Sequence, residues 1–121
     1  MCYCLSVSSG PAGEPECVLI RALEPVEGID LMAHRRGKEK LRDLCSGPGK
    51  LCQALQIDKS LYGVDVTQKG PLHIVSGAAP EKIEATPRIG IDYAIYTKDE
   101  PWRFIIAGNP FVSGAKKKPS L

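Results

Sequence analysis

The stretch Leu44–Leu55, which reads LCSGPGKLCQAL, decides how the middle of this chain folds. Ser46 or Gly47 can cap a helix, and Pro48 has the fixed φ angle that is favoured at the first helical position. Good helix formers follow, so we predict a helix that begins here. Its buried face is predicted to carry Leu51, Cys52 and Leu55.

The same helix start has features that suit an anion. Its backbone N–H groups and the positive end of the helix dipole lie beside the Lys50 ammonium, and phosphate is attracted to such a place. Most capped helix starts contact only water, so this motif by itself predicts an anion site weakly.

Length and composition fit one small globular domain. The chain has 121 residues, of which 43% are hydrophobic and 25% charged. A net charge of +2 is only mildly basic and does not by itself favour nucleic acid. We find no apolar run of about 20 residues that could cross a bilayer, and no secretory signal, and so expect no membrane association.

The five cysteines are an odd number and indicate reduced thiols in an intracellular protein. Zinc is a poor fit, because Cys2 and Cys4 are too close, Cys45 and Cys52 are too far apart, and the two histidines lack partners at ligand spacing. We therefore expect no metal or cofactor, and we expect all five cysteines to be small buried hydrophobes.

The first third of the chain is predicted to contain a strand pair and a helix. Strands over Met1–Ser9 and Cys17–Leu23 are joined by a short turn and should pair antiparallel. Apolar spacing predicts a helix over Pro25–Arg36 that ends at Gly37, and Lys38–Leu44 adds a further turn.

Short strands and turns alternate in the remainder. The predicted fold class is α+β, with a mainly antiparallel sheet and short helices, followed by a basic disordered tail over 114–121. The predicted strands are Leu72–Val75, Lys82–Ala85, Ile89–Tyr93 and Trp102–Ala107.

Four segments in fixed order carry a family resemblance. Together with LCSGPGKLCQAL, three others resemble the alkyladenine (3-methyladenine, methylpurine) DNA glycosylase family. The three are CVLIRALEP (17–25), RIGIDYA (88–94), and PWRF (101–104) running on to GNPFVS (108–113). The resemblance extends to Ser113 and implies a curved sheet in a single, incomplete domain over residues 1–113, the C-terminal part of the family's domain.

The resemblance implies a base excision repair enzyme. Such a hydrolase, of the DNA-3-methyladenine glycosylase II type, flips an alkylated or deaminated purine out of double-stranded DNA and hydrolyses its N-glycosidic bond. It implies a monomer without cofactor, in the nucleus of a eukaryote or the cytoplasm and nucleoid of a bacterium.

The resemblance assigns roles to Arg21, Ile89, Lys50 and Lys59. Arg21 matches an arginine that holds the attacking water, and Ile89 matches a position whose backbone carbonyl does the same. Lys50 and Lys59 match basic positions near the DNA backbone. The alternatives are a buried, carboxylate-paired arginine for Arg21 and solvated surface residues for the two lysines.

Three further positions match the base pocket. Cys4 and Leu19 match residues that line or support it, although either could be plain core. Ser6 lies where the family commonly has an asparagine that excludes the exocyclic amine of guanine, so this resemblance implies looser rejection of guanine.

The family's catalytic glutamate has no counterpart in these 121 residues. Neither Glu24 nor Asp65 lies in a segment that matches it. We therefore expect an N-terminally truncated chain that is inactive alone, with unpaired strand edges and exposed apolar surface. The alternatives are a non-catalytic DNA-binding remnant and an inert fragment.

Overall fold

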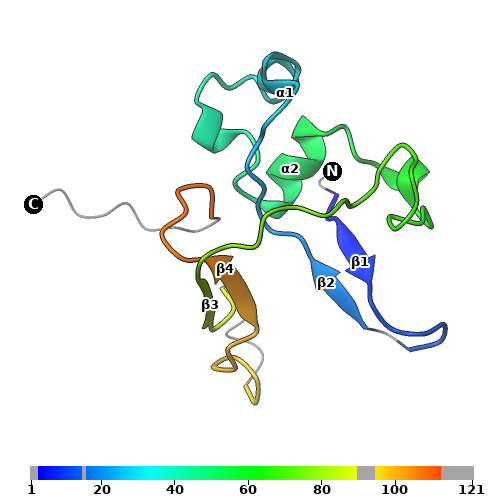
Figure 1. The fold of residues 1–121 in the computed structure, drawn as a ribbon, viewed down its shortest axis with the longest axis vertical. Helices are drawn as coiled ribbons and strands as arrows, with labels where there is room; N and C mark the ends of the chain where they lie inside the picture. The colour runs from blue at the N-terminus through cyan, green and yellow to red at the C-terminus, as the bar shows by residue number, and fades with distance from the viewer. Residues whose placement is uncertain (1–2, 15, 90–94, 113–121) are drawn as a thin grey trace, which may run out of the picture.

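The computed structural model describes residues 3–14, 16–89 and 95–112 and confirms an α+β fold of short helices and antiparallel strands (Figure 1). The elements in chain order are β1 (Ser6–Ser8), β2 (Cys17–Leu19), α1 (Ile29–Arg36), the 3-10 turn η1 (Leu41–Asp43), α2 (Pro48–Ala54), the 3-10 turn η2 (Lys59–Leu61), β3 (Ile83–Thr86) and β4 (Arg103–Ile106).

Helix α2 begins where the sequence predicts. Gly47 is its N-cap in an extended conformation, and Pro48 is the first helical residue. The Leu51 N–H donates to the Gly47 carbonyl at 2.9 Å, which closes the first turn. Of the two predicted caps, the backbone of Gly47 therefore fills the position, and Ser46 lies outside the helix.

The core of the molecule lies around α2. Leu44 and Leu51 are fully buried, and Leu55 packs against the core from its edge, which confirms the predicted buried face of the helix. The core residues are Met32, Leu44, Cys45, Leu51, Cys52, Ala54 and Ile57.

Helix α1 packs against α2 and is shorter than predicted. Gly28 has a φ angle of 70°, a left-handed conformation that interrupts a right-handed helix, so α1 begins at Ile29 and not at Pro25. Its end is as predicted, because Gly37 adopts a φ angle of 62° and Lys38 donates its N–H to the Ala33 carbonyl at 3.2 Å.

Arg36, at the end of α1, ties the helices and the intervening turn together. Its guanidinium donates to the Leu44 carbonyl at 3.2 Å, the Asp43 carbonyl at 3.3 Å and Gln53 Oε1 at 2.7 Å. One side chain therefore fixes the segment between the helices against both of them.

The strands β1 and β2 form the predicted antiparallel pair, with Ser6 opposite Leu19 and Ser8 opposite Cys17. Both strands are shorter than predicted. The hairpin is anchored to the helical core, because the Leu23 N–H donates to the Cys45 carbonyl at 3.0 Å.

The strands β3 and β4 form a second antiparallel pair, with Ile83 opposite Ile106, and confirm two of the predicted strands. The predicted strand Leu72–Val75 is wrong. Among the described residues, that segment makes one backbone hydrogen bond, from the Ile74 N–H to the Val66 carbonyl at 2.7 Å, and no strand pairs with it. In the predicted strand Ile89–Tyr93, Ile89 lies in a bend and the other residues lie outside the described part.

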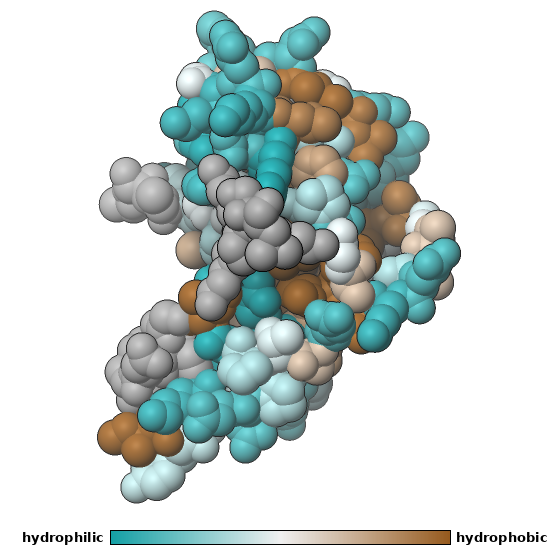
Figure 2. All heavy atoms as spheres, turned by 90° about the vertical axis from the view of Figure 1, so that its left-hand side faces the viewer, coloured by the Kyte–Doolittle hydropathy of each residue, from teal (hydrophilic) through white to brown (hydrophobic). Residues whose placement is uncertain are grey.

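The residues that the structure describes form two separate two-stranded sheets, whereas one curved sheet was expected. In Figure 1, β2 and β4 face each other across the molecule, while β1 and β3 lie on the outer sides. Figure 2 shows hydrophobic residues reaching the surface over the helical part at the top, whereas the lower part of this face is mostly hydrophilic apart from an apolar spot near its lower end. In the second hairpin, Ile83, Phe104 and Ile106 are exposed. The expected exposure of apolar side chains is thus present.

The described cysteines fall into two classes. Cys45 and Cys52 are buried, as predicted, and burial raises the pKa of both thiols. Cys4 and Cys17 are free but exposed, so the expectation that they are buried is wrong. Both lie in or beside β1 and β2, whose residues are mostly exposed. Cys2 and the predicted tail lie outside the described residues.

In the described residues, no helix has both the length and the apolar character that crossing a membrane requires.

Candidate functional site

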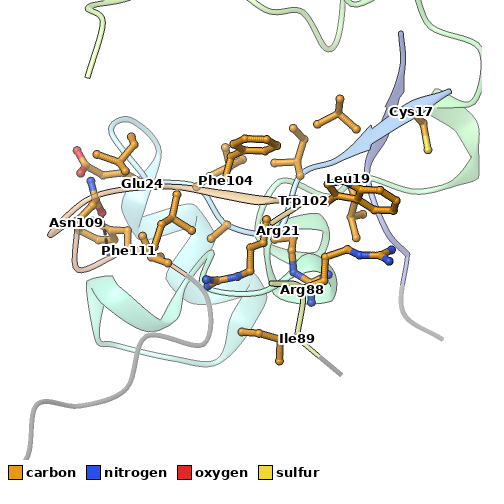
Figure 3. A pocket seen from close by; sticks show the side chains of 18 residues that line it. Cys17, Leu19, Arg21, Glu24, Arg88, Ile89, Trp102, Phe104, Asn109 and Phe111 are labelled. Atoms are coloured by element: carbon orange, nitrogen blue, oxygen red, sulfur yellow. Dashed lines mark hydrogen bonds between the residues drawn. The ribbon is translucent and has the colours of Figure 1, made fainter. Parts of the chain in front are cut away.

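A cavity of about 900 Å³ lies between the two hairpins (Figure 3). One wall is β2 with the segment that follows it, residues 17–24. The other is β4 with its flanking residues 102–106, and residues 88 and 89 close one side. The space therefore lies where the two small sheets face each other.

Arg21 lies on the first wall, just beyond β2, and is half-buried. Its Nε atom is buried, and no hydrogen-bond partner for it exists in the described part of the chain. The lining carboxylate, Glu24, gathers with Asn109 and Phe111 at the end of the cavity opposite Cys17 (Figure 3).

Two further arginines line the cavity. Arg88 donates from Nη2 to Thr97 Oγ1 at 3.0 Å, and its guanidinium carbon lies 4.9 Å from the centre of the Trp102 ring, within cation–π range. Arg103 donates from Nη1 to Thr86 Oγ1 at 3.3 Å. With Arg21 these place three guanidinium groups in the lining, where Glu24 is the one carboxylate among the described residues.

The structure brings together three of the residues that the sequence singled out. Leu19 and Arg21 from one segment and Ile89 from a distant one line the same cavity. Leu19 is 36% exposed and Ile89 47%, so both present apolar surface to it.

Ser6 and Cys4 do not line this cavity. Ser6 stands opposite Leu19 in the β1–β2 ladder, and opposed side chains share one face of a sheet, so Ser6 lies one strand away. Cys4 is exposed and precedes β1. Their predicted roles in a base pocket remain predictions.

The two predicted DNA contacts lie on the helical part. Lys50 is exposed in the first turn of α2, and Lys59 is exposed in η2. The Lys50 stem lies beside Gly47, because a Cβ atom at position 47 would be in ordinary contact with Lys50 Cδ at 3.4 Å. Neither lysine lines the cavity, and the anion site at the start of α2 remains a prediction.

Sequence reasoning assigned no role to Arg88, Trp102 or Phe104, yet all three line the cavity. The available signal was that they lie inside two of the four segments that resemble the family. Their meeting depends on the β3–β4 register, which no local pattern reveals.

Within the described residues, no group of three or more histidine, cysteine, aspartate or glutamate side chains could hold a metal ion.

A sequence model of the family described as Methylpurine-DNA glycosylase (MPG) matches residues 1–110. The chain belongs to this family. A protein of Bacillus licheniformis described as "Putative 3-methyladenine DNA glycosylase" is 51% identical over 109 residues, which cover 90% of this chain and 55% of the relative. A protein of Methanocella arvoryzae with the same description is 46% identical over 114 residues, covering 93% of this chain and 57% of the relative.

The chain spans about half the length of these curated relatives. The cavity is therefore formed by a chain that matches only part of these relatives.

Proposed function

We propose that the chain supplies part of a DNA glycosylase that hydrolyses the N-glycosidic bond of alkylated or deaminated purines in duplex DNA. Membership of the methylpurine-DNA glycosylase family supports this class of hydrolase. The observation that carries the proposal for this chain is the meeting of Arg21, Leu19 and Ile89 in one cavity.

The cavity suits an extruded purine in size and character. Ligand pockets commonly measure about 300–1,000 Å³, and the cavity holds about 900 Å³. Trp102 and Phe104 line it and are exposed, which gives aromatic faces for stacking. Enzymes that act on a base must take it out of the duplex and hold it by such contacts.

In this proposal Arg21 and the Ile89 backbone carbonyl position the water that attacks the sugar. A guanidinium donates hydrogen bonds to the water oxygen, and a carbonyl accepts one from it. A general base must also lie within hydrogen-bond reach of that water. We assign the role of general base to no residue of this chain. Glu24, the carboxylate among the described lining residues, lies beside Asn109 and Phe111 at one end of the cavity (Figure 3).

Lys50 and Lys59 are proposed to contact phosphates of the duplex. Both are exposed, and ammonium groups act on phosphate as point charges. Such contacts position a protein on DNA without reading its sequence.

Base release tests the activity. A duplex with one hypoxanthine is incubated with the chain, and abasic sites are cleaved and counted. We expect no release by the chain alone, and release after addition of the part of the Bacillus licheniformis relative outside the matched residues. Arg21→Met should lower that rate about a hundredfold or more, while Arg42→Met, at an exposed site in η1, should leave it unchanged.

Salt-dependent gel shifts test the DNA contacts. Each phosphate contact contributes about 0.9 to the slope of log affinity against log salt. Replacing Lys50 and Lys59 together by alanine should therefore lower the slope by about 2, and Lys98→Ala, at an exposed site, should not change it. Duplex binding without base release in the mixture would support the non-catalytic remnant. Neither binding nor release would support the inert fragment.

A further inference from the structure

The β3–β4 ladder ends just before the residues that close one side of the cavity. Its last pair is Thr86 with Arg103. Pro87 follows Thr86 and has no N–H to donate. On the other strand, the Trp102 N–H donates to the Glu100 carbonyl at 2.8 Å and so is not available to β3. Backbone pairing in the described residues therefore does not continue beyond Thr86.

The side chain of Arg88 connects the two strands beyond the end of the ladder. Its Nη2 donates to Thr97 Oγ1 at 3.0 Å, and its guanidinium carbon lies 4.9 Å from the centre of the Trp102 ring. Its Nε atom is buried and has no hydrogen-bond partner among the described residues, so water is kept from this part of the side chain. A cation is attracted to an aromatic ring more strongly where water is excluded. The Arg88 side chain is therefore held from two directions.

The two residues that Arg88 contacts belong to one folded turn. The Glu100 N–H donates to the Thr97 carbonyl at 3.1 Å, and the Glu100 carbonyl accepts the hydrogen bond from the Trp102 N–H. Thr97 and Trp102 are thus tied to each other through Glu100. Arg88 therefore binds a turn that is already closed by its own hydrogen bonds.

The backbone of Ile89 has no comparable support. Ile89 lies in a bend, and its side chain is 47% exposed. Within the described part of the chain, no hydrogen bond reaches its N–H or its carbonyl. In Figure 3, Arg88 lies between the Trp102 ring and Ile89. The fixed residue Arg88 therefore determines where the backbone of its neighbour Ile89 lies.

We propose that Arg88 is a positioning residue, which holds the chain against Trp102 and Thr97 and thereby fixes the Ile89 carbonyl at the side of the cavity. The inference rests on the proposed function for the role of that carbonyl, which accepts a hydrogen bond from the attacking water. Arg88 touches neither the water nor the base and acts through Ile89. A displacement of about 1 Å at a reacting group can lower a rate about a hundredfold, so the support of this carbonyl matters.

Backbone ¹⁵N relaxation of the full 121-residue chain, without DNA, tests the positioning. We expect an Ile89 order parameter of about 0.85, typical of rigid backbone, in the unsubstituted chain and one below about 0.6 in Arg88→Met. Thr97→Val removes only the hydroxyl acceptor and should lower the order parameter by a smaller amount. Lys98→Met, the matched control, removes an exposed cation from the same turn and should leave it unchanged.

Base release tests the consequence of the positioning. The assay is the mixture of this chain with the part of the Bacillus licheniformis relative outside the matched residues. The single-turnover rate on the hypoxanthine duplex is measured at saturating protein, and the duplex affinity is measured by gel shift. We expect Arg88→Met to lower the rate about tenfold or more and to change the affinity by less than about twofold. A loss of overall structure would lower both, and a phosphate contact by Arg88 would lower the affinity.

Several results would overturn the proposal. They are a mobile Ile89 in the unsubstituted chain, an Ile89 order parameter that neither Arg88→Met nor Thr97→Val changes, and an unchanged release rate in Arg88→Met. A fall in duplex affinity that accounts for the whole loss of rate would overturn it as well. No release by the unsubstituted mixture would contradict the proposed function, and the relaxation measurement would still decide whether Arg88 positions Ile89.

Discussion

Replacing Arg36 by alanine should destabilise the helical part far more than its half-exposed position indicates. The Arg36 guanidinium donates to two backbone carbonyls, those of Leu44 and Asp43, in partly buried surroundings. The variant leaves both acceptors without this donor, and Leu44 is itself a fully buried core residue.

The magnitude follows from the kind of bond. Hydrogen bonds from a charged donor each contribute about 1.5–3 kcal/mol, and partial exposure places these two at the low end. The third bond, to Gln53 Oε1, is exposed and contributes little. We expect the free energy of unfolding to fall by about 2–3 kcal/mol, a large share of the 5–15 kcal/mol typical of a domain.

Urea unfolding followed by helical circular dichroism measures this loss. Arg42→Ala is the matched control, because Arg42 is an exposed arginine on the neighbouring turn η1, and its change should stay within about 0.5 kcal/mol. Equal losses of unfolding free energy in the two variants would refute the reasoning, because the loss of one positive charge, and not of the Arg36 hydrogen bonds, would then explain both. Arg36 also lowers the pKa of the Cys45 thiol against the effect of burial, so that pKa should rise in the variant.

Two further predictions concern titratable groups. Iodoacetamide at pH 8 should label the exposed Cys17 in minutes and leave Cys45 and Cys52 unlabelled until urea is added, because burial raises the pKa of both buried thiols. Mass spectrometry of the peptides measures the labelling of each cysteine. Early labelling of Cys52 would contradict this prediction. The Ser60 hydroxyl and N–H, which donate to Asp58, lower the pKa of that carboxyl, so the stabilisation of η2 should be present above the unfolded pKa of about 3.9 and be lost as pH falls through the folded pKa. Titration by NMR should give a higher pKa for Asp58 in Ser60→Ala, and an unchanged value would count against the assigned cause.

The helical part was the more predictable half of the fold because its signals are local. The start of α2 follows from Gly47 and Pro48, and the end of α1 follows from Gly37. The start of α1 was missed, since apolar spacing continues back to Pro25, and only the left-handed conformation of Gly28 ends it.

The cavity was less predictable because its parts meet through two separate ladders. The sequence singled out Arg21 because it lies in a segment that resembles the family. That its Nε atom is buried without a hydrogen-bond partner among the described residues could not be predicted, because a sequence motif does not indicate how deeply an atom is buried. The pairing of Arg88 with Trp102 depends on how β3 and β4 align, and a shift of one residue would place different side chains on this face. The false strand at Leu72–Val75 has the same origin, because an apolar run forms a strand only where a partner lies beside it.

Burial is unevenly distributed over the residues that carry the proposed function. All the fully buried side chains in the described residues belong to the helical part, which carries Lys50 and Lys59, whereas the hairpins that wall the cavity expose Leu19 and Phe104. The proposed DNA contacts therefore rest on the well-packed region, and the proposed chemistry rests on the more exposed region.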